Sequence, residues 1–407
     1  MKILILLNIV SSDGGGAEWS LLDVCRGLAE RGHELHCIYC KEGDLLPHYQ
    51  QFCKTVTKVS TYRIQGCKPS SSIRFITSLL QVRHTQFDLI YANYYSQTFF
   101  GGIVARVKGI PLVCHLRSYP PQKRHFPAQI QIGLNSCTSM IAVSQAARSS
   151  YLKAGLNPQT IKVVYNGIDL ERFVLGSDRD VTRQALGIPP RAFVVLYAGR
   201  ITPPKNIEML IHAFARLGLQ CDQARLLITG SSFSFSYNPV EGDLYQQKLV
   251  DLCQKLGISD RVHWLGKRTD VPELFRAADV SVLPSLLPET FGRVIAESMA
   301  CGTPAIGLRY GGIPEVLSGE FQRFQVATGD VAGLTQQLLA LKDWQKFDPT
   351  LGQRCRAYVE EHFSKERMVE EVEQTMQAAI ASHPRQFGSP HSKAVKFHPW
   401  YPDSLGV

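Results

Sequence analysis

Residues Pro284–Gly312 read PSLLPETFGRVIAESMACGTPAIGLRYGG, and their pattern decides the fold. The apolar run Val280–Leu283 before them predicts a strand that ends in a proline-rich loop. Residues Phe291–Ala300 have helical composition and are followed by Gly302, which ends a helix, and Ala305–Leu308 is a second short apolar run. Strand, helix and strand within about 30 residues predict a βαβ unit of a parallel sheet.

Two acidic residues in this stretch, Glu289 and Glu297, are candidates for ligand binding. At roughly 1.5 Å rise per residue, their carboxylates are expected about 12 Å apart. Two carboxylates that act together on one glycosidic bond lie roughly 5–10 Å apart, so these two are expected to make separate hydrogen bonds along one extended ligand. The loop and the helix start at Gly292 also suit an anion, because backbone N–H groups are exposed there.

Composition limits the class of protein. The chain has 407 residues, 44% of them hydrophobic and 19% charged, which predicts a folded protein with two domains of ordinary size. No apolar run approaches the length of about 20 residues that spans a bilayer. The opening run Met1–Val10 has no small-residue cleavage site after it and is expected to be a buried first strand. The eleven dispersed cysteines predict reduced thiols and a cytoplasmic location.

Positive charge is concentrated in the first half of the chain. The net charge is +9, and Leu45–Ile168 contains 14 Lys and Arg residues but only one acidic residue, Asp88. A basic surface favours an anionic partner, such as acidic lipid headgroups at the inner membrane face or a phosphorylated acceptor. No nucleic acid is expected, because the basic residues are not interleaved with an aromatic RNA-binding motif. A generic solvated face is the alternative interpretation.

A glycine-rich turn follows the first expected strand, Lys2–Asn8. It reads SSDGGGAE over Ser11–Glu18 and leads into an expected helix, Trp19–Arg31. This order is typical of mononucleotide-binding units, in which glycines let the backbone approach a phosphate. Neither a Walker loop nor the G-x-G-x-x-G spacing is present. Gly15 and Gly16 are the candidates for such an approach, and a tight turn that needs positive φ is the alternative.

Four further short apolar runs predict strands: Leu89–Ala92, Leu112–His115, Met140–Val143 and Val163–Tyr165. Open α/β sheets bind their ligands beyond the carboxyl ends of the strands. We therefore expect Asn93, His115 and Arg117 on the floor of a cleft, on the N-terminal side.

Two segments together resemble the signature of one enzyme family. Glu289 and Glu297, followed by ACGTP at 300–304 and GGIPE at 311–315, resemble the donor-binding signature of retaining family 4 glycosyltransferases. These enzymes have two Rossmann-like domains facing across a cleft, the GT-B fold. The glycine-rich turn, with GLAERGH after it, is similar to the N-terminus of that family, whose loop faces the donor diphosphate. The resemblance covers roughly residues 1–380.

The loop GRITPPKN over Gly199–Asn206 follows the expected strand Phe193–Ala198 and resembles the family's cationic loop. There the two cations bind the donor diphosphate, and fixed positive charges can stabilise a departing diphosphate without a metal ion. Arg200 offers a bidentate fork and Lys205 a compact charge. Asn206 stands where the family usually has glycine, which puts the position of Lys205 in question.

The resemblance implies roles for individual residues. The donor-binding set is Gly15, Gly16, Arg200, Lys205, Glu289, Phe291, Gly292 and Glu297. Glu289 is expected at the sugar hydroxyls and Glu297 at the ribose. The catalytic set is Glu289, His115, Arg200 and Lys205, with His115 beside the transferred sugar. Weaker signals place Asn93, Arg117 and Tyr119 on the acceptor side. No metal and no cofactor other than the nucleotide-diphosphate-sugar donor are expected.

The predicted fold class is α/β, with two doubly wound Rossmann-like domains. The expected division is an acceptor-side domain 1–172, a linker 173–192, a nucleotide-sugar-binding domain 193–363, a helix 364–381 that crosses back to the first domain, and a flexible tail 382–407.

The function implied is a retaining, hexosyl-type glycosyltransferase. It would move a sugar from the donor to a glycan or lipid-linked acceptor in cell-surface polysaccharide or glycolipid synthesis, in the cytoplasm or at the inner membrane face. Retention by front-face attack and retention through a covalent intermediate both remain open. Two alternatives for the protein itself are a sugar-nucleotide 2-epimerase, which needs no acceptor, and a non-catalytic carbohydrate- or membrane-binding relic.

Overall fold

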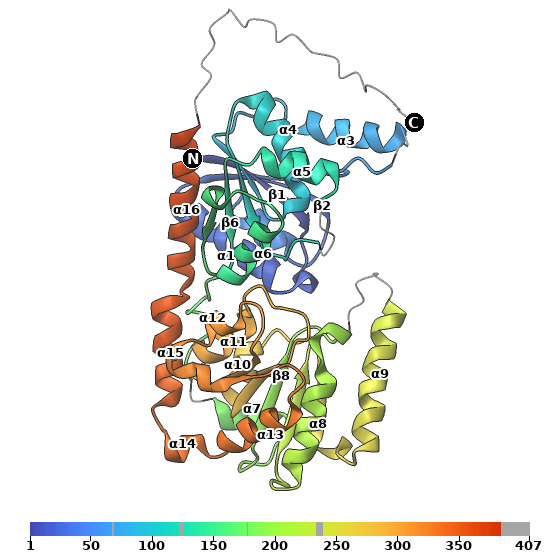
Figure 1. Cartoon of the computed structure of the whole chain (residues 1–407), viewed down its shortest axis with the longest axis vertical. Helices are drawn as coiled ribbons and strands as arrows, with labels where there is room; N and C mark the ends of the chain where they lie inside the picture. The colour runs from blue at the N-terminus through green and yellow to red at the C-terminus, as the bar shows by residue number, and fades with distance from the viewer. Residues whose placement is uncertain (67–68, 122–125, 177, 233–238, 384–407) are drawn as a thin grey trace, which may run out of the picture.

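The computed structural model describes residues 1–66, 69–121, 126–176, 178–232 and 239–383. They form two α/β domains, one above the other in Figure 1, with the C-terminal helices along one side of both. Most of the predicted tail 382–407 and the middle of the loop 231–242 lie outside the described residues. Each domain contains a parallel sheet between layers of helices, which confirms the predicted fold class.

The sheet of the first domain has the strand order β3-β2-β1-β4-β5-β6-β7, and all its pairs are parallel. The strands are β1 (Lys2–Ile9), β2 (Glu34–Lys41), β3 (Thr55–Lys58), β4 (Leu89–Ala92), β5 (Leu112–Leu116), β6 (Ser139–Ala142) and β7 (Ile161–Val163). The helices are α1 (Gly16–Glu30), α2 (Leu46–Phe52), α3 (Pro69–Gln81), α4 (Thr98–Lys108), α5 (Ala128–Asn135) and α6 (Gln145–Lys153), with short 3₁₀ turns η1 (Ser12–Gly14), η2 (Tyr95–Gln97) and η3 (Pro158–Thr160).

The sheet of the second domain has the order β10-β9-β8-β11-β12-β13, again parallel. Its strands are β8 (Val194–Ala198), β9 (Arg225–Thr229), β10 (Val262–Gly266), β11 (Val280–Leu283), β12 (Ala305–Leu308) and β13 (Gln325–Val326). Its helices are α7 (Arg179–Ala185), α8 (Ile207–Gly218), α9 (Pro239–Lys255), α10 (Val271–Ala277), α11 (Arg293–Ala300), α12 (Ile313–Val316), α13 (Val331–Ala340), α14 (Trp344–Phe347) and α15 (Leu351–His362), with 3₁₀ turns η4 (Pro203–Lys205), η5 (Ser259–Arg261) and η6 (Gly319–Phe324).

In both sheets the order of the strands reverses at the first strand of the domain. In the first domain β1 lies between β2 and β4, and in the second β8 lies between β9 and β11. Loops that leave the carboxyl ends of such neighbouring strands diverge and leave a crevice for a ligand. The glycine-rich turn after β1 and the cationic loop after β8 therefore both lie where such sheets bind their ligands.

The segment expected to be a linker, 173–192, contains helix α7, which belongs structurally to the second domain. Arg183 of α7 is buried and donates hydrogen bonds to the carbonyl oxygens of Ala277 and Ala192, and to Oδ2 of Asp279 at 2.8 Å. The polar composition of this segment suggested an exposed connection. Arg183, however, makes its hydrogen bonds inside the second domain. The prediction of a linker over the whole segment was wrong for this reason.

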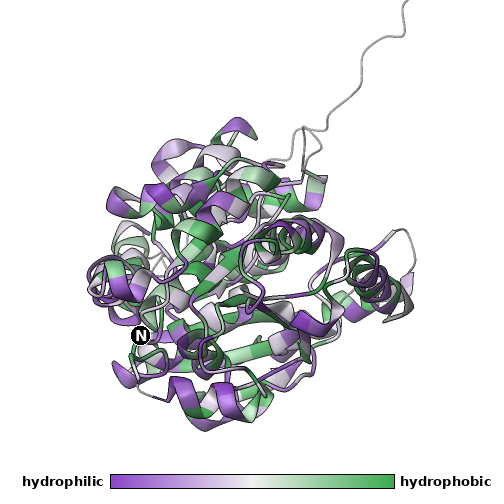
Figure 2. Cartoon of the chain, turned by 90° about the horizontal axis from the view of Figure 1, so that it is seen from below, coloured by the Kyte–Doolittle hydropathy of each residue, from purple (hydrophilic) through white to green (hydrophobic). Residues whose placement is uncertain are grey.

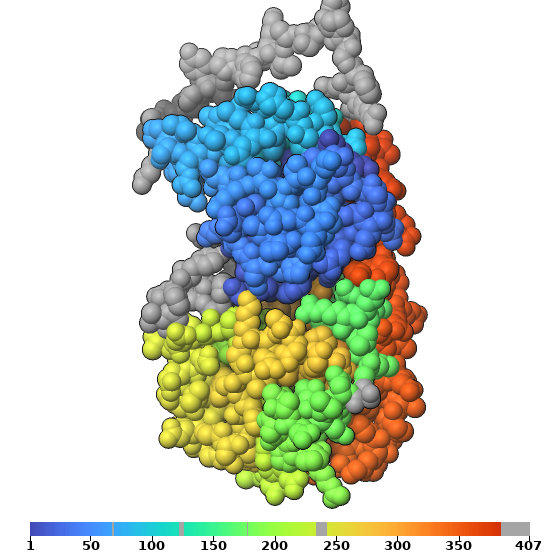
Figure 3. Space-filling model, turned by 180° about the vertical axis from the view of Figure 1, so that it is seen from behind, coloured from blue at the N-terminus to red at the C-terminus, as the bar shows by residue number. Residues whose placement is uncertain are grey.

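The C-terminal helix α16 (Lys365–Ser382) lies against α1 of the first domain, whereas α15 packs on α11 of the second. Met368, Val372 and Met376 of α16 are buried in the same core cluster as strand β1. Figure 3 shows this C-terminal segment, in orange and red, along one side of both domains. The chain thus joins the domains twice, once near residue 170 and once through α16.

Figure 2, which colours the ribbon by residue hydropathy, shows hydrophobic residues along the central strands and many hydrophilic residues on the outer helices. The central strands β1, β4, β5 and β8 are buried along nearly their whole length, as expected for parallel strands covered on both faces. Among the described residues, no helix has the length and apolar character needed to cross a membrane.

Candidate functional site

A cavity of about 330 Å³, here called the interdomain cavity, lies where the two domains face each other. Its walls include both predicted glutamates, both cations of the loop after β8, and the glycine-rich turn of the first domain. The predicted residues that line it are Gly15, Gly16, Arg117, Arg200, Lys205, Glu289, Phe291, Gly292 and Glu297. The structure therefore brings the complete predicted donor-binding set into one place, from segments nearly 300 residues apart.

The N-terminus of α1 faces the second domain across this cavity. Gly15, the residue before α1, has φ +84°, a conformation that favours glycine. A Cβ at Gly15 would lie 3.8 Å from Nε of Arg200, and one at Gly16 would lie 3.4 Å from Cδ of Arg293. The exposed N–H groups of a 15-residue helix thus point to the same region as fixed cations, an arrangement that suits an anion.

Lys205 is held at the cavity by an unusual backbone conformation at the next residue. Asn206 adopts the left-handed conformation, with φ 54° and ψ 44°, and begins helix α8. Asparagine tolerates this conformation better than other side chains except glycine, so it can replace the usual glycine of the family without moving the loop. The question that Asn206 raised about the position of Lys205 is resolved by this geometry, because Lys205 lines the cavity.

Glu289 forms an ion pair with Lys205 and accepts a hydrogen bond of 2.6 Å from the Ser285 hydroxyl. Burial alone would raise the pKa of Glu289, but the charges of Lys205 and Arg200 and the bonds from Lys205 and Ser285 lower it below its usual value. Glu289 is therefore ionised at neutral pH. The two predicted ligand-binding charges thus neutralise each other in this ion pair.

Glu297 is paired with a different cation, Arg293, one helical turn earlier on α11, at 2.7 Å. Arg293 is 8% exposed and also binds Asp23 of α1 at 2.7 Å, so this charged group joins the two domains. Burial opposes the positive charge of Arg293, but Asp23 and Glu297 raise its pKa above the usual value. The sequence reasoning missed Arg293 and Asp23. The spacing of four residues between Arg293 and Glu297 could have indicated that pair. Nothing in the sequence links Asp23 to Arg293.

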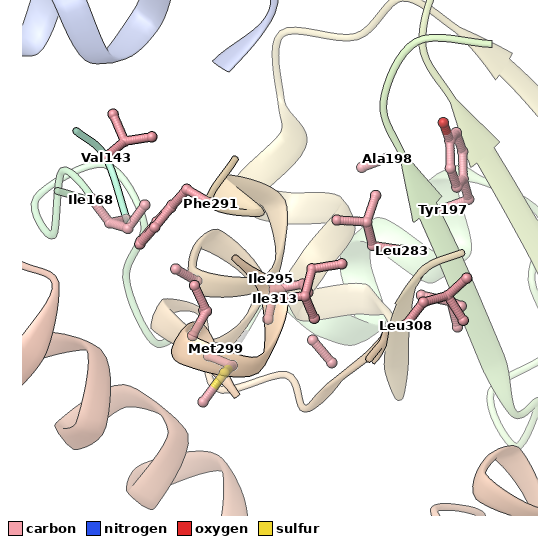
Figure 4. Packing of buried hydrophobic residues seen from close by; sticks show 14 of the residues in the cluster. Val143, Ile168, Tyr197, Ala198, Leu283, Phe291, Ile295, Met299, Leu308 and Ile313 are labelled. Atoms are coloured by element: carbon pink, nitrogen blue, oxygen red, sulfur yellow. The ribbon is translucent and has the colours of Figure 1, made fainter. Parts of the chain in front are cut away.

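Phe291 packs against other aromatic rings in the wall of the cavity. It is 1% exposed, and its ring lies 6.2 Å from the Tyr165 ring and 5.3 Å from the Phe363 ring. Figure 4 shows Phe291 between Ile168 of the first domain and Ile295 of α11. Gly292, with φ +93°, follows it as the residue before α11. Phe291 thus anchors the start of α11 against the first domain, and Gly292 leaves the helix start open to the cavity.

His115 is fully buried at the end of β5 and lies behind the interdomain cavity, not among its lining residues. Its Nδ1 is 2.5 Å from the Tyr91 hydroxyl, and its Nε2 has no hydrogen-bond partner among the described residues. Burial and the nearby charge of Arg117 hold the pKa of His115 well below its usual value, so the ring is neutral. The structure therefore does not bring His115 together with the predicted donor-binding residues, although the sequence predicted it beside the transferred sugar.

Arg117, just after β5, organises a buried polar network with residues of α1, of the loop after β4 and of the loop after β7. Its Nη1 donates to Ser20 at 2.7 Å and to Asn166 at 3.0 Å, and its Nε donates to Oδ1 of Asn93 at 2.5 Å. Asn93 is fully buried, and its Nδ2 has no partner among the described residues. Arg117 therefore fixes the floor of the cavity while its side chain remains 5% exposed.

The loop after β5 also contacts the second domain directly. The Tyr119 hydroxyl donates to the Glu289 carbonyl oxygen at 3.1 Å, and the Thr290 hydroxyl donates to the Arg117 carbonyl oxygen at 3.1 Å. These two bonds hold the loop that carries Glu289 against the first domain.

A second, smaller cavity of about 280 Å³, here called the bridging cavity, shares Gly14 and Arg200 with the interdomain cavity. It is lined by Glu18, which is 5% exposed and accepts a hydrogen bond of 2.9 Å from the Tyr94 hydroxyl. Burial raises the pKa of Glu18 to about 7, although the bond from Tyr94 and the charge of Arg117 oppose the rise. The sequence reasoning quoted Glu18 only as the end of the glycine-rich turn and gave it no role.

Among the residues that the structure describes, no group of three or more His, Cys, Asp and Glu side chains could hold a metal ion.

Two family models match the chain, one in each domain. The model described as Glycosyltransferase Family 4 matches residues 14–172, and that described as Glycosyl transferases group 1 matches residues 178–358. The second match contains the cationic loop and both glutamates of the interdomain cavity.

The sequence similarity to two known glycosyltransferases covers most of the chain. The N-acetyl-alpha-D-glucosaminyl L-malate synthase of Bacillus anthracis is 27% identical over 92% of this chain and 96% of its own. A D-inositol 3-phosphate glycosyltransferase of Catenulispora acidiphila is 29% identical over 81% of this chain and 83% of its own.

Solved structures show the same arrangement of domains. The crystal structure of Anabaena HepE in complex with UDP superposes with a TM-score of 0.79 at 27% identity, over 93% of this chain and 100% of that one. Its complex with UDP-glucose gives a TM-score of 0.78 at 26% identity, over 92% of this chain and 99% of that one. With both family models matched and this fold shared, the chain belongs to the family 4 (group 1) glycosyltransferases of the GT-B type.

Proposed function

We propose that this glycosyltransferase transfers a hexosyl group from a nucleotide-diphosphate-sugar to a glycan or lipid-linked acceptor, with retention at the anomeric carbon. The observation that carries the proposal is the composition of the interdomain cavity. Six cationic side chains, among them Arg200 and Lys205, two carboxylates and the N-terminus of α1 surround a space within the range typical of small-molecule sites. A nucleotide-sugar needs positive charge at its diphosphate and acceptors at its ribose and sugar hydroxyls.

Each charged residue then has one task. Arg200 and Lys205 bind the diphosphate, helped by the backbone N–H groups at Gly15 and Gly16. Glu297, oriented by Arg293, binds the ribose hydroxyls. Glu289 leaves Lys205 when the donor enters and binds the hydroxyls of the sugar. Domain closure around the donor excludes water, which limits hydrolysis.

In the net reaction the acceptor oxygen forms a bond to the anomeric carbon while the bond from that carbon to the diphosphate oxygen breaks. The acceptor proton leaves with the nucleoside diphosphate. Arg200 and Lys205 stabilise the negative charge that develops on the departing oxygen, so the protein supplies the charge compensation from its own side chains.

The comparisons support a UDP-sugar as the first donor to test, because HepE was solved with UDP and with UDP-glucose. On the acceptor side, Tyr119 and the loop of Arg117 approach Glu289, and Asn93 lies behind them. The acceptors named in two relatives, malate and inositol 3-phosphate, both carry negative charge.

The test is transfer by the purified full chain from UDP-glucose, UDP-N-acetylglucosamine and GDP-mannose to a panel of sugars, polyols and glycolipids. Product glycoside is measured by mass spectrometry, with and without EDTA. We expect acceptor-dependent product that survives EDTA, and its loss in Arg200→Ala. A C2-epimerised nucleotide-sugar formed without acceptor, or no turnover of any donor, would contradict the proposal.

A further inference from the structure

A third cavity lies entirely within the first domain. It has a volume of about 460 Å³ and lies at the carboxyl ends of β1 and β2, between the loop 60–65, the start of α3 and the turn η2. It is here called the basic cavity, because Lys41, Arg63 and Arg74 line it. Among the described residues that line it there is no Asp or Glu.

The remaining walls are rich in hydroxyl groups. Ser60, Thr61, Ser70, Ser71 and Ser96 all line the cavity. Arg63 and Arg74 bring two guanidinium groups to the wall of one concave space. Arginine forks and hydroxyl groups together are the usual partners of a phosphate, and they also suit a carboxylate.

The loop that carries Arg63 is fixed by hydrogen bonds on both sides. Ser78 of α3 accepts hydrogen bonds from the backbone N–H groups of Ser60 and Thr61, each at 3.2 Å. On the other side, the side-chain amide of Gln129 on α5 binds the N–H and the carbonyl oxygen of Ile64, at 3.4 and 3.0 Å. The position of the loop is therefore set by the fold before any ligand binds.

Arg63 itself is oriented within this loop. Its Nε donates to the Ser96 carbonyl oxygen at 3.3 Å, and its backbone N–H donates to the Thr61 hydroxyl at 3.1 Å. The bond to Ser96 uses one of the five N–H groups of the guanidinium. The same bond ties the loop to the turn η2 and directs Arg63 to the border between two cavities, since Arg63 also lines the bridging cavity.

The basic cavity and the interdomain cavity are both neighbours of the bridging cavity. The basic cavity shares Asn8, Ile9, Arg63 and Ser96 with the bridging cavity. The bridging cavity in turn shares Arg200 with the interdomain cavity, where the donor diphosphate is proposed to bind. An acceptor held in the basic cavity would therefore extend past Glu18 towards the sugar.

From this arrangement we propose that the basic cavity binds an anionic group, a phosphate or a carboxylate, of the acceptor substrate. The proposal rests on the proposed function for the meaning of "acceptor", but the binding of the anion itself does not. Arg63 and Arg74 are the principal ligands, and Ser60 and Ser71 supply hydroxyl donors. The acceptor hydroxyl would then lie beside Glu18, which connects this cavity to the donor.

The anion can belong to a soluble molecule or to a lipid. Helix α3, which contributes Arg74 to the cavity, exposes Ile73, Ile76 and Leu80, with 63%, 53% and 48% of each residue accessible. Their spacing of three and four residues places them on one face of the helix. A lipid-carried phosphate would bring acyl chains to such a face, whereas a soluble phosphate would not need it.

The test measures binding by the full chain to two probes. The soluble probe is sn-glycerol 3-phosphate, with glycerol as its uncharged match, titrated by calorimetry. The lipid probe is vesicles of phosphatidylcholine and phosphatidic acid in equal parts, with pure phosphatidylcholine as its match, followed by sedimentation. The variants are Arg63→Gln and Arg74→Gln, and the control is Arg106→Gln, an exposed arginine of α4 in the same domain outside the cavity.

We expect binding of one charged probe, weakened by about tenfold in each cavity variant and unchanged in Arg106→Gln. Binding of glycerol 3-phosphate alone identifies a soluble acceptor. Binding of the acidic vesicles, reduced also by Ile73→Ser/Ile76→Ser, identifies a lipid-linked one. If neither charged probe binds better than its match, or if Arg106→Gln weakens binding as much as the cavity variants, the basic cavity is not an anion site.

Stabilisation by UDP is measured on the same samples. If UDP does not bind to the parent chain, the proposed function is contradicted, whereas the result for the anion is unaffected. Retained UDP binding without anion binding would contradict only the inference about the basic cavity.

Discussion

Asp23 of the first domain and Arg293 of the second form an ion pair of 2.7 Å between side chains that are 10% and 8% exposed. The same arginine binds Glu297, the residue proposed to hold the ribose. The contact between the domains and the orientation of a donor-binding carboxylate therefore depend on one guanidinium. This ion pair thus couples the contact between the domains to the orientation of the residue proposed to hold the ribose.

Replacement of one partner of this pair leaves the other charge buried without compensation. We expect Asp23→Asn to lower the free energy of unfolding by about 3 kcal/mol and to weaken UDP binding. The exposed pair Lys58–Glu42 is the control, and Glu42→Gln should leave the unfolding temperature unchanged. Equal effects of the two substitutions in thermal unfolding would show that Arg293 does not depend on Asp23.

The pair Lys205–Glu289 predicts a separation of stability from activity. Each single variant, Lys205→Met or Glu289→Gln, should lower stability by about 1–2 kcal/mol, because each leaves a partly buried polar group without its partner. The double variant should recover much of that stability but no transfer activity, since both residues are proposed to act on the donor. Activity that returned in the double variant would contradict their proposed roles.

Gly311 holds the loop of Glu289 from behind. Its φ is +67°, and a Cβ there would lie 2.4 Å from the Glu289 carbonyl oxygen. We expect Gly311→Ala to reduce transfer by at least about a hundredfold, because it must displace Glu289. Gly319 is a matched control with φ +59° and no atom within 4 Å of its Cβ position, so Gly319→Ala carries the backbone strain alone. Steady-state kinetics of both variants decides, and similar losses in the two would contradict the steric argument.

Glu18 predicts a pH dependence of stability. Its pKa is about 7 in the folded chain, against an ordinary value of 4.5, so the folded chain binds this proton more tightly than the unfolded chain. The stabilisation is full below pH 4.5 and is lost as the pH rises through about 7, by an amount of the order of 3 kcal/mol. Glu18→Gln should remove this dependence. The measurement is the difference in unfolding free energy between parent and variant at about pH 5 and about pH 8, and a difference that does not change with pH would contradict it.

The sequence predicted the parts of the site that come from continuous segments. The βαβ pattern, the cationic loop and the glycine-rich turn are local, and their residues gather as expected because parallel strands bring their carboxyl ends to one edge. The predicted strand ends were correct to within a few residues, as for Leu89–Ala92 and Ala305–Leu308.

The sequence could not predict the contacts that join distant segments. Asp23 and Arg293 are 270 residues apart, and only the packing of the domains pairs them. The raised pKa of Glu18 comes from burial, which a motif does not encode. Arg183 was assigned to a polar linker, because the sequence does not distinguish an exposed arginine from a buried one whose hydrogen bonds go to carbonyl oxygens.

The most direct test of the central claim is thermal unfolding of the full chain with UDP, UDP-glucose, GDP-mannose and their free nucleosides. At a hundredfold excess over its dissociation constant, a true donor should add about 2.7 kcal/mol of stability. We predict this shift for one nucleoside diphosphate and its sugar, and its loss in Arg200→Ala and Glu297→Gln. If no nucleotide stabilises the parent chain, or if the shift persists in both variants, the interdomain cavity is not the donor site.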